Sequence, residues 1–278
     1  MAVRLIVHFL IQLLFTVGII VATGLIVSLA KRGILRCSGK GAHAIEVATG
    51  LIGTPIHELS HAFFCILFCH RITAIRLWSP HASGGNLGYV THTYKKRNLW
   101  HQIGNFFIGV APILGGTAVL FLLMWLLLPG VADTVLASAA LTPPDASGSV
   151  WEVALEQTLA ILSRSWQTLC AFFQPQRFLE WHFYLYLLFA IPIVLHMEVS
   201  GSDLKLGGWG LLFLSVLLFL TDLAFLFLFP EGMEAITGAA LSVGAFAGGF
   251  FLLAIAVSLF LLLLSLAVLL IRRLARRG

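Results

Sequence analysis

Six long apolar runs divide this chain, and they constrain its fold more than any other feature of the sequence. Each is near the length that an α-helix needs to cross the hydrocarbon core of a bilayer. Of the 278 residues, 59% are hydrophobic and 10% are charged, which is typical of a membrane protein with several spans. We therefore expect an all-α polytopic membrane protein, with residues 1–278 forming one integral membrane domain. The expected spans are residues 5–29, 47–69, 102–128, 180–197, 207–229 and 243–271.

The basic residues between the runs predict the orientation of the chain. Lys and Arg concentrate on the cytoplasmic side of membranes. The last apolar run is followed by four arginines, which predict a cytoplasmic C-terminus: Arg272, Arg273, Arg276 and Arg277. Counting back places residues 70–101 inside, which agrees with their basic charge. Residues 31–40 disagree, because their basic side chains would lie outside unless the first run is tilted or re-entrant or the later charges override it. The net charge of +5 is explained by orientation, so we expect a lipid bilayer and no nucleic acid as partner.

Inside the second run lies the sequence His57-Glu58-Leu59-Ser60-His61. On a helix, two histidines four residues apart share one face, at the spacing that suits two ligands of one zinc ion. Glu58 then lies beside the metal, where a carboxylate can take a proton from a zinc-bound water. Two other interpretations are a polar cluster between packed helices and part of a proton or ion path. Because His and Glu are costly inside a membrane, we favour a hydrolytic zinc site.

Between the second and third spans, residues 70–94 predict a β-hairpin. Two β-prone runs, 72–78 and 87–92, flank a turn signal that includes Ser79-Pro80 and Ser83-Gly84-Gly85-Asn86. The edge of this hairpin, with Gly88 and Tyr89, is a candidate surface for an extended peptide. Residues 130–178 are expected outside the cytoplasm, as a loop over 131–150 followed by an interfacial helix over 151–173.

A hydrolytic zinc site needs a third protein ligand, and Asp203 is our first candidate. Pro192 can kink the fourth helix and Ser200-Gly201-Ser202-Asp203 can break it, which would let Asp203 project from an unwound end. Glu198, His196 and Asp222 remain alternatives, and a sulfur ligand from Cys65 is only weakly supported. Asn105 either bridges helices or hydrogen bonds the substrate backbone or the developing oxyanion.

The zinc motif in a membrane helix, the hairpin after it and the later Asp together resemble the site-2 protease superfamily of intramembrane zinc metalloproteases. The resemblance covers residues 47–206 as a three-helix core, with residues 207–278 as accessory spans and no PDZ domain. Near the third ligand, the family's best-known pattern is N-x-x-P followed by an Asp-Gly pair. This chain instead has Ser200-Gly201-Ser202-Asp203-Leu204, which resembles a variant of the motif seen in bacterial members. The resemblance implies a bacterial cytoplasmic membrane, ligands His57, His61 and Asp203, and a hairpin that receives substrate.

The expected function is a zinc metalloprotease that cleaves membrane-protein substrates within the membrane, with Glu58 as the general base. One alternative is a membrane zinc protease that cuts at chain termini or in loops. Another is a metal or proton transporter that uses His57, Glu58, His61 and Asp222.

Overall fold

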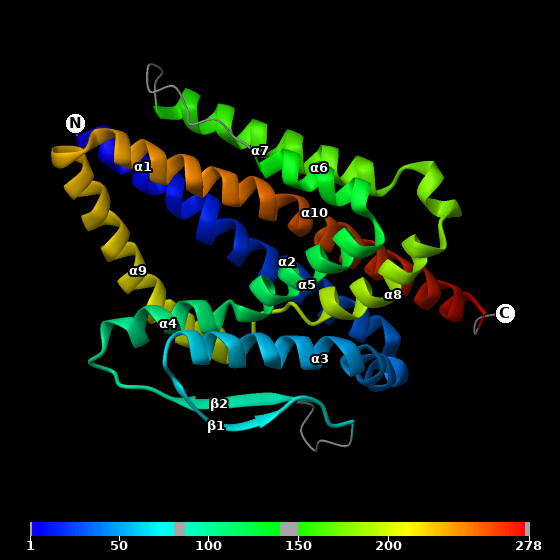
Figure 1. The fold of residues 1–278 in the computed structure, drawn as a ribbon. Helices are drawn as coiled ribbons and strands as arrows, with labels where there is room; N and C mark the ends of the chain where they lie inside the picture. The colour runs from blue at the N-terminus through cyan, green and yellow to red at the C-terminus, as the bar shows by residue number, and fades with distance from the viewer. Residues whose placement is uncertain (1, 81–86, 140–149, 276–278) are drawn as a thin grey trace. The chain divides into compact units, whose positions relative to one another are not determined.

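The computed structural model describes residues 2–80, 87–139 and 150–275, and these are almost all helical (Figure 1). Two antiparallel strands form a small sheet, β1 (Arg71–Arg76) and β2 (Tyr89–Thr93). The helices in chain order are α1 (Ala2–Leu13), a π-helical stretch (Leu14–Gly18), α2 (Ile19–Ser38), a 3₁₀ turn (Gly39–Gly41), α3 (Ala42–Leu67), α4 (Leu99–Gly109), α5 (Ala111–Leu127), α6 (Pro129–Ala139), α7 (Val150–Phe172), a second 3₁₀ turn (Pro175–Leu179), α8 (Trp181–Leu195), α9 (Gly201–Leu228) and α10 (Pro230–Leu274).

Fewer helices than the six expected spans are long and apolar enough to cross a bilayer. In the described part of the chain, three stretches meet that condition: Val3–Leu67, Gly201–Leu228 and Glu231–Leu274. A fourth is added if α4 and α5, which meet at a bend of 60°, form one broken span. The first two expected spans belong to a single helical stretch of 65 residues, and α8 has 15 residues, fewer than a span needs. The structure therefore shows helices of membrane-span character but does not confirm six spans.

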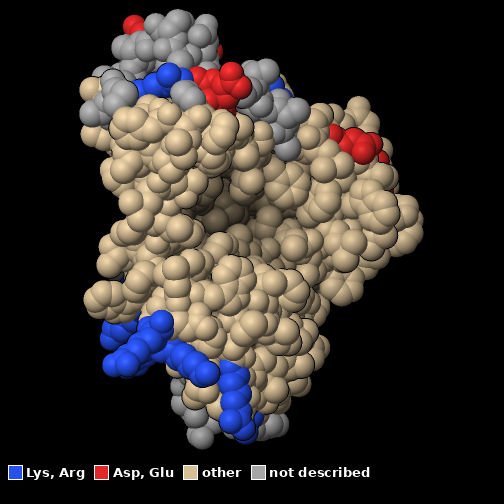
Figure 2. All heavy atoms as spheres, turned by 60° about the vertical axis from the view of Figure 1, so that its left-hand side comes forward, with Lys and Arg blue, Asp and Glu red and all other residues tan. Residues whose placement is uncertain are grey.

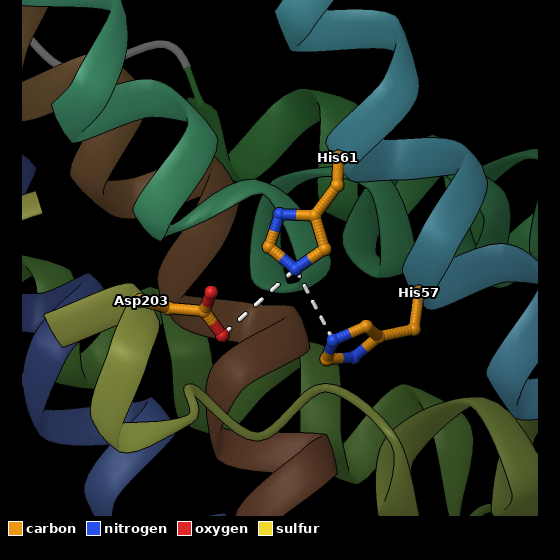
Figure 3. Close-up of side chains that lie close together, drawn as sticks. All are labelled: His57, His61 and Asp203. Atoms are coloured by element: carbon orange, nitrogen blue, oxygen red, sulfur yellow. Dashed lines mark hydrogen bonds and ion pairs between the residues drawn. The ribbon is translucent and has the colours of Figure 1, made fainter. Parts of the chain in front are cut away.

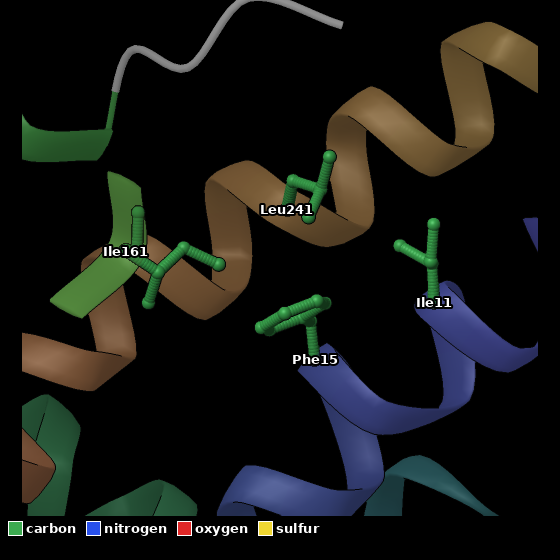
Figure 4. Close-up of a cluster of buried hydrophobic side chains, with 5 residues drawn as sticks. Ile11, Phe15, Ile161 and Leu241 are labelled. Atoms are coloured by element: carbon green, nitrogen blue, oxygen red, sulfur yellow. The ribbon is translucent and has the colours of Figure 1, made fainter. Parts of the chain in front are cut away.

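The chain divides into two compact units, each with its own packing. Unit 1 comprises residues 1–22, 121–186 and 211–253. Its core includes Ile11 and Phe15 from the first helical stretch, Ile161 from α7, and Leu241 and Ala245 from α10 (Figure 4). Residues 131–139, which we expected to lie in a loop, are instead part of helix α6, because this helix packs along α7. The rest of that expected loop, residues 140–149, lies outside the described residues.

Unit 2 comprises residues 23–120, 187–210 and 254–278, and it contains all of the expected zinc ligands except the alternative Asp222. In this unit the hairpin lies along α3, as Figure 1 shows, and α4 also packs on α3. The expected hairpin is confirmed, although its turn at 81–86 lies outside the described residues. Helices α2 and α10 approach each other at Gly33 and Leu262. The basic residues 31–40 therefore belong to the same unit as Arg272 and Arg273, whereas Arg276 and Arg277 are not described.

Most of the surface drawn in Figure 2 carries no charged side chain. The Lys and Arg side chains seen in this view gather in small areas of the surface. Large exposed apolar residues are numerous on the helices, for example Ile66, Trp209 and Leu263, each at least 65% exposed. Because a soluble protein rarely exposes apolar surface on this scale, the helices suit a lipid environment.

Candidate metal centre

Helix α3 presents His57, Glu58 and His61 toward one site. The two histidines are one helical turn apart, so their rings lie on the same face, with ring centroids 4.9 Å apart. Glu58 and His61 are buried, with 6% and 7% of their surfaces exposed, and His57 is half-buried. Helix formation through this apolar stretch is therefore enough to bring the three side chains together.

Asp203 reaches the same site from the first turn of α9. The Ser200 main-chain N–H donates to Asp203 Oδ2 at 3.0 Å, and the Asp203 N–H donates to Ser200 Oγ at 3.2 Å. This reciprocal pair is a capping box, which satisfies free N–H groups at a helix start and fixes the carboxylate's direction. The sequence Ser200-Gly201-Ser202-Asp203 thus begins α9, whereas we expected it to break a helix. The break between α8 and α9 lies at residues 196–200.

The ring nitrogens of the two histidines converge on a common point, as Figure 3 shows together with Asp203. His57 Nδ1 donates to the His196 carbonyl at 2.7 Å, and His61 Nδ1 donates to the Ile108 carbonyl at 2.8 Å. Because each neutral ring carries one hydrogen and a carbonyl can only accept, both Nε2 atoms are left as bare acceptors. They lie 3.2 Å apart, so their lone pairs repel unless a cation lies between them.

Zinc fits this donor set. His61 Nε2 is 3.9 Å from Asp203 Oδ2, and ligand atoms of His57, His61 and Asp203 all lie within 4.8 Å of one another. Ligands of a tetrahedral zinc at ordinary bond lengths are about 3.4 Å apart. Two imidazoles with hydrogen-bonded Nδ1 atoms and one carboxylate are a common zinc environment. The three residues can therefore hold a metal ion with small adjustments of their side chains.

A cavity of about 290 Å³ opens beside these residues, and Glu58 lies in its wall. Residues of α3, the second strand with the residue before it, the end of α4 and the start of α9 line it, so the cavity adjoins the metal-binding atoms. The lining residues are His57, Glu58, His61, Gly88, Tyr89, Val90, His92, Ile108, Ser200, Ser202, Asp203 and Leu206.

Glycine permits two close approaches to α3. A Cβ atom at Gly88 would lie 2.8 Å from Glu58 Cγ and 2.9 Å from the Arg76 carbonyl oxygen. A Cβ atom at Gly53 would lie 2.4 Å from both His196 Nδ1 and the Pro192 carbonyl oxygen. Because any side chain larger than hydrogen would collide there, these glycines let the hairpin and the 196–200 segment reach the metal-binding face.

A second histidine pair fixes the hairpin beside the cavity. His70 Nε2 donates to the His101 carbonyl at 3.1 Å, and His70 Nδ1 lies 3.1 Å from His92 Nδ1. Burial lowers the pKa of His70 to about 4; the hydrogen bond to the His101 carbonyl opposes this shift, and the charges of His92 and His101 add to it. Burial also lowers the pKa of His92, against the opposing effect of the Asp203 carboxylate. Both rings are therefore neutral at pH 7 and available for neutral hydrogen bonds.

The alternative ligands make other contacts. Glu198 pairs with Lys31, and His196 Nδ1 donates to the Pro192 carbonyl at 2.9 Å. Asp222 belongs to unit 1, where it is fully buried and accepts from Gln12 Nε2 at 3.1 Å. Among the described residues, the metal-binding group includes none of these three alternatives, nor does it include Cys65. Asp203 is thus the third ligand that the geometry favours.

Of the residues expected to contact substrate, Gly88 and Tyr89 line the cavity and Asn105 does not. Asn105 is buried on α4 and donates to Gln102 at 3.1 Å, while its Oδ1 has no partner. No role for His92 was predicted from the sequence, although strand alternation after Val90 places it on the cavity side. The capping role of Ser200 was not predicted either, although the S-x-x-D spacing indicates it.

The chain was compared with protein-family models, curated proteins and solved structures. No family model, curated protein or solved structure matches it.

Proposed function

We propose that this chain is a zinc-dependent intramembrane endopeptidase of the site-2 protease type. The observation that carries the proposal is the convergence of His57, His61 and Asp203, with Glu58 in the wall of the same cavity. We further propose that it lies in a bacterial cytoplasmic membrane with its C-terminus in the cytoplasm. The basic residues at the ends of α2 and α10 and the polar, basic hairpin segment support this orientation.

The protein's contribution begins with Glu58. Zinc, when bound, supplies a Lewis acid that lowers the pKa of a water molecule and polarises the scissile carbonyl. Glu58 takes a proton from the attacking water and returns it to the leaving nitrogen of the cleaved peptide bond. The carbonyls of His196 and Ile108 hold the two imidazoles in one tautomer, so that both Nε2 atoms stay directed at the site.

The hairpin supplies a place for an extended substrate segment. β2 pairs with β1 on one side in the described structure, and residues 88–92 run along the cavity. A membrane-spanning substrate hides its carbonyls in helical hydrogen bonds, so it must unwind before cleavage. Pairing of the unwound segment with the free edge of β2 would replace the lost hydrogen bonds and present a carbonyl beside Glu58.

The position of the cut tests this proposal against its rivals. Purified protein in liposomes would be incubated with single-span membrane peptides, with bound zinc first removed by a chelator and then restored. We expect zinc-dependent products whose new ends, read by mass spectrometry, lie within the apolar segment. Cuts confined to loops or termini would favour a different membrane protease. Intact peptides together with zinc or proton flux would favour a transporter and contradict the proposal.

A further inference from the structure

A partly buried ion pair connects α2 to the 196–200 segment beside the metal-binding residues. The Lys31 ammonium lies 2.5 Å from Glu198 Oε1 and 3.7 Å from Glu46 Oε1 on α3. Lys31 is only 7% exposed, although a lysine side chain ordinarily extends its charged end into water. A desolvated lysine of this kind is retained only where its partners compensate for the loss of water.

The segment that Glu198 belongs to controls two of the three metal ligands. On one side of Glu198, the His196 carbonyl accepts the Nδ1 hydrogen of His57. On the other side, Ser200 forms the capping box that directs the carboxylate of Asp203. Because Glu198 lies two residues from each of these contacts, a shift of its backbone would move both ligands together.

The ion pair lies at a cavity and not in a packed core. A space of about 140 Å³ adjoins Lys31, Glu46, Glu198, His57 and Glu58. Most residues that line this space are polar or charged, whereas Met197 and Val199 hold the 196–200 segment elsewhere through buried apolar side chains. Two buried side-chain atoms of residues that line this space, His196 Nε2 and Thr54 Oγ1, have no hydrogen-bond partner. On this polar side of the segment, the charged contact between Lys31 and Glu198 therefore adds to the restraint that the buried Met197 and Val199 provide.

We propose that Lys31 is a positioning residue for the metal centre, acting through Glu198 on the 196–200 segment. This inference rests on the proposed function, since it assigns Lys31 a role in holding the ligands of that same zinc site. Loss of the Lys31 charge leaves Glu198 and Glu46 without their cation in a partly buried cavity. The segment then relaxes toward water and carries the His196 carbonyl and Ser200 away from His57 and Asp203.

The test compares Lys31→Met with wild type in the full chain, purified in detergent. In metal-free protein, hydrogen exchange of the amides at 196–200 should become at least about tenfold faster in the variant. The zinc dissociation constant, measured by chelator competition, should rise about 10- to 100-fold, as for other groups that orient metal ligands. Lys31→Arg keeps the charge and should restore zinc affinity to within about threefold of wild type.

Two further variants make the result decisive. Arg32→Met removes the same charge from the neighbouring, exposed position and should change neither measurement. Glu198→Gln removes the negative charge of the other partner and should have the same two effects that we expect of Lys31→Met. It serves as the test if Lys31→Met does not fold. The inference is wrong if a folded Lys31→Met or Glu198→Gln variant has the same hydrogen-exchange rates at 196–200 and the same zinc affinity as wild type. If wild type binds no zinc, the proposed function fails, and the exchange rates still decide whether Lys31 holds the segment.

Discussion

His57 and His61 face each other through bare Nε2 atoms 3.2 Å apart, while their Nδ1 hydrogens are donated to carbonyls of two other segments. Without a cation this arrangement is repulsive, so metal should stabilise the fold. At a free zinc concentration 100 times the dissociation constant, we expect the free energy of unfolding to rise by about 2.7 kcal/mol. His61→Ala should abolish most of this gain, as measured by thermal unfolding with and without zinc.

The control for that experiment is His43→Ala. His43 lies on the same helix but is exposed and outside the metal-binding group. This variant should gain as much stability from zinc as wild type does. Equal gains in His61→Ala and His43→Ala would show that zinc binds elsewhere.

Removal of the capping hydroxyl should affect both α9 and the metal centre. We expect Ser200→Ala to lower the free energy of unfolding by about 1 kcal/mol, because the Asp203 N–H loses its acceptor. Zinc affinity should fall roughly tenfold, because the Asp203 carboxylate is no longer held in direction. Calorimetric titration with zinc measures the second effect. Ser38→Ala, which removes a hydroxyl bonded within α2, should leave zinc affinity unchanged.

Substitution of Gly88 should separate substrate binding from metal binding. A methyl group at this position would collide with Glu58, Thr54 and the Arg76 carbonyl, so Gly88→Ala should push the hairpin away from α3. We expect peptide cleavage to fall at least about tenfold while zinc content stays at the wild-type level. Gly201→Ala is the matched control, since its added methyl group meets nothing within 4 Å. Wild-type cleavage by Gly88→Ala would argue against the hairpin's role.

Acid should loosen the hairpin through His70. Its pKa in the folded protein is about 4, below the usual value of 6.5, so the unfolded chain binds this proton first. The stability contributed by neutral His70 is fully present above pH 6.5 and is lost as the pH falls toward 4. The free energy of unfolding of wild type should therefore decrease more steeply between pH 7 and pH 4.5 than that of His70→Gln. Parallel pH profiles would contradict this assignment.

Local rules were sufficient for the parts of the site that lie on one element. The i, i+4 spacing of His57 and His61 places two rings on one face wherever the chain is helical. The alternating and turn-rich pattern of residues 70–94 likewise predicted a hairpin that the structure confirms. Asp203 was a harder case, since its direction depends on a capping box that the sequence analysis treated as a helix break.

The remaining features depend on long-range contacts that sequence periodicity does not contain. The contact between Lys31 and Glu198 joins residues 167 positions apart, and the Gln12–Asp222 bond joins residues 210 apart. Apolar composition indicates that a run can enter a membrane, but it does not show where a helix turns or continues. The two runs that join into the stretch Val3–Leu67 and the short α8 illustrate why the expected count of six spans was not confirmed.

The most direct measurement is peptide cleavage by zinc-loaded Glu58→Gln. Glutamine keeps the size of the side chain but cannot accept the proton of the attacking water. Because Glu58 does not belong to the metal-binding group, the variant should hold as much zinc as wild type by elemental analysis. We predict that its cleavage rate falls at least about 100-fold. Cleavage at the wild-type rate by a fully zinc-loaded Glu58→Gln would contradict the mechanism.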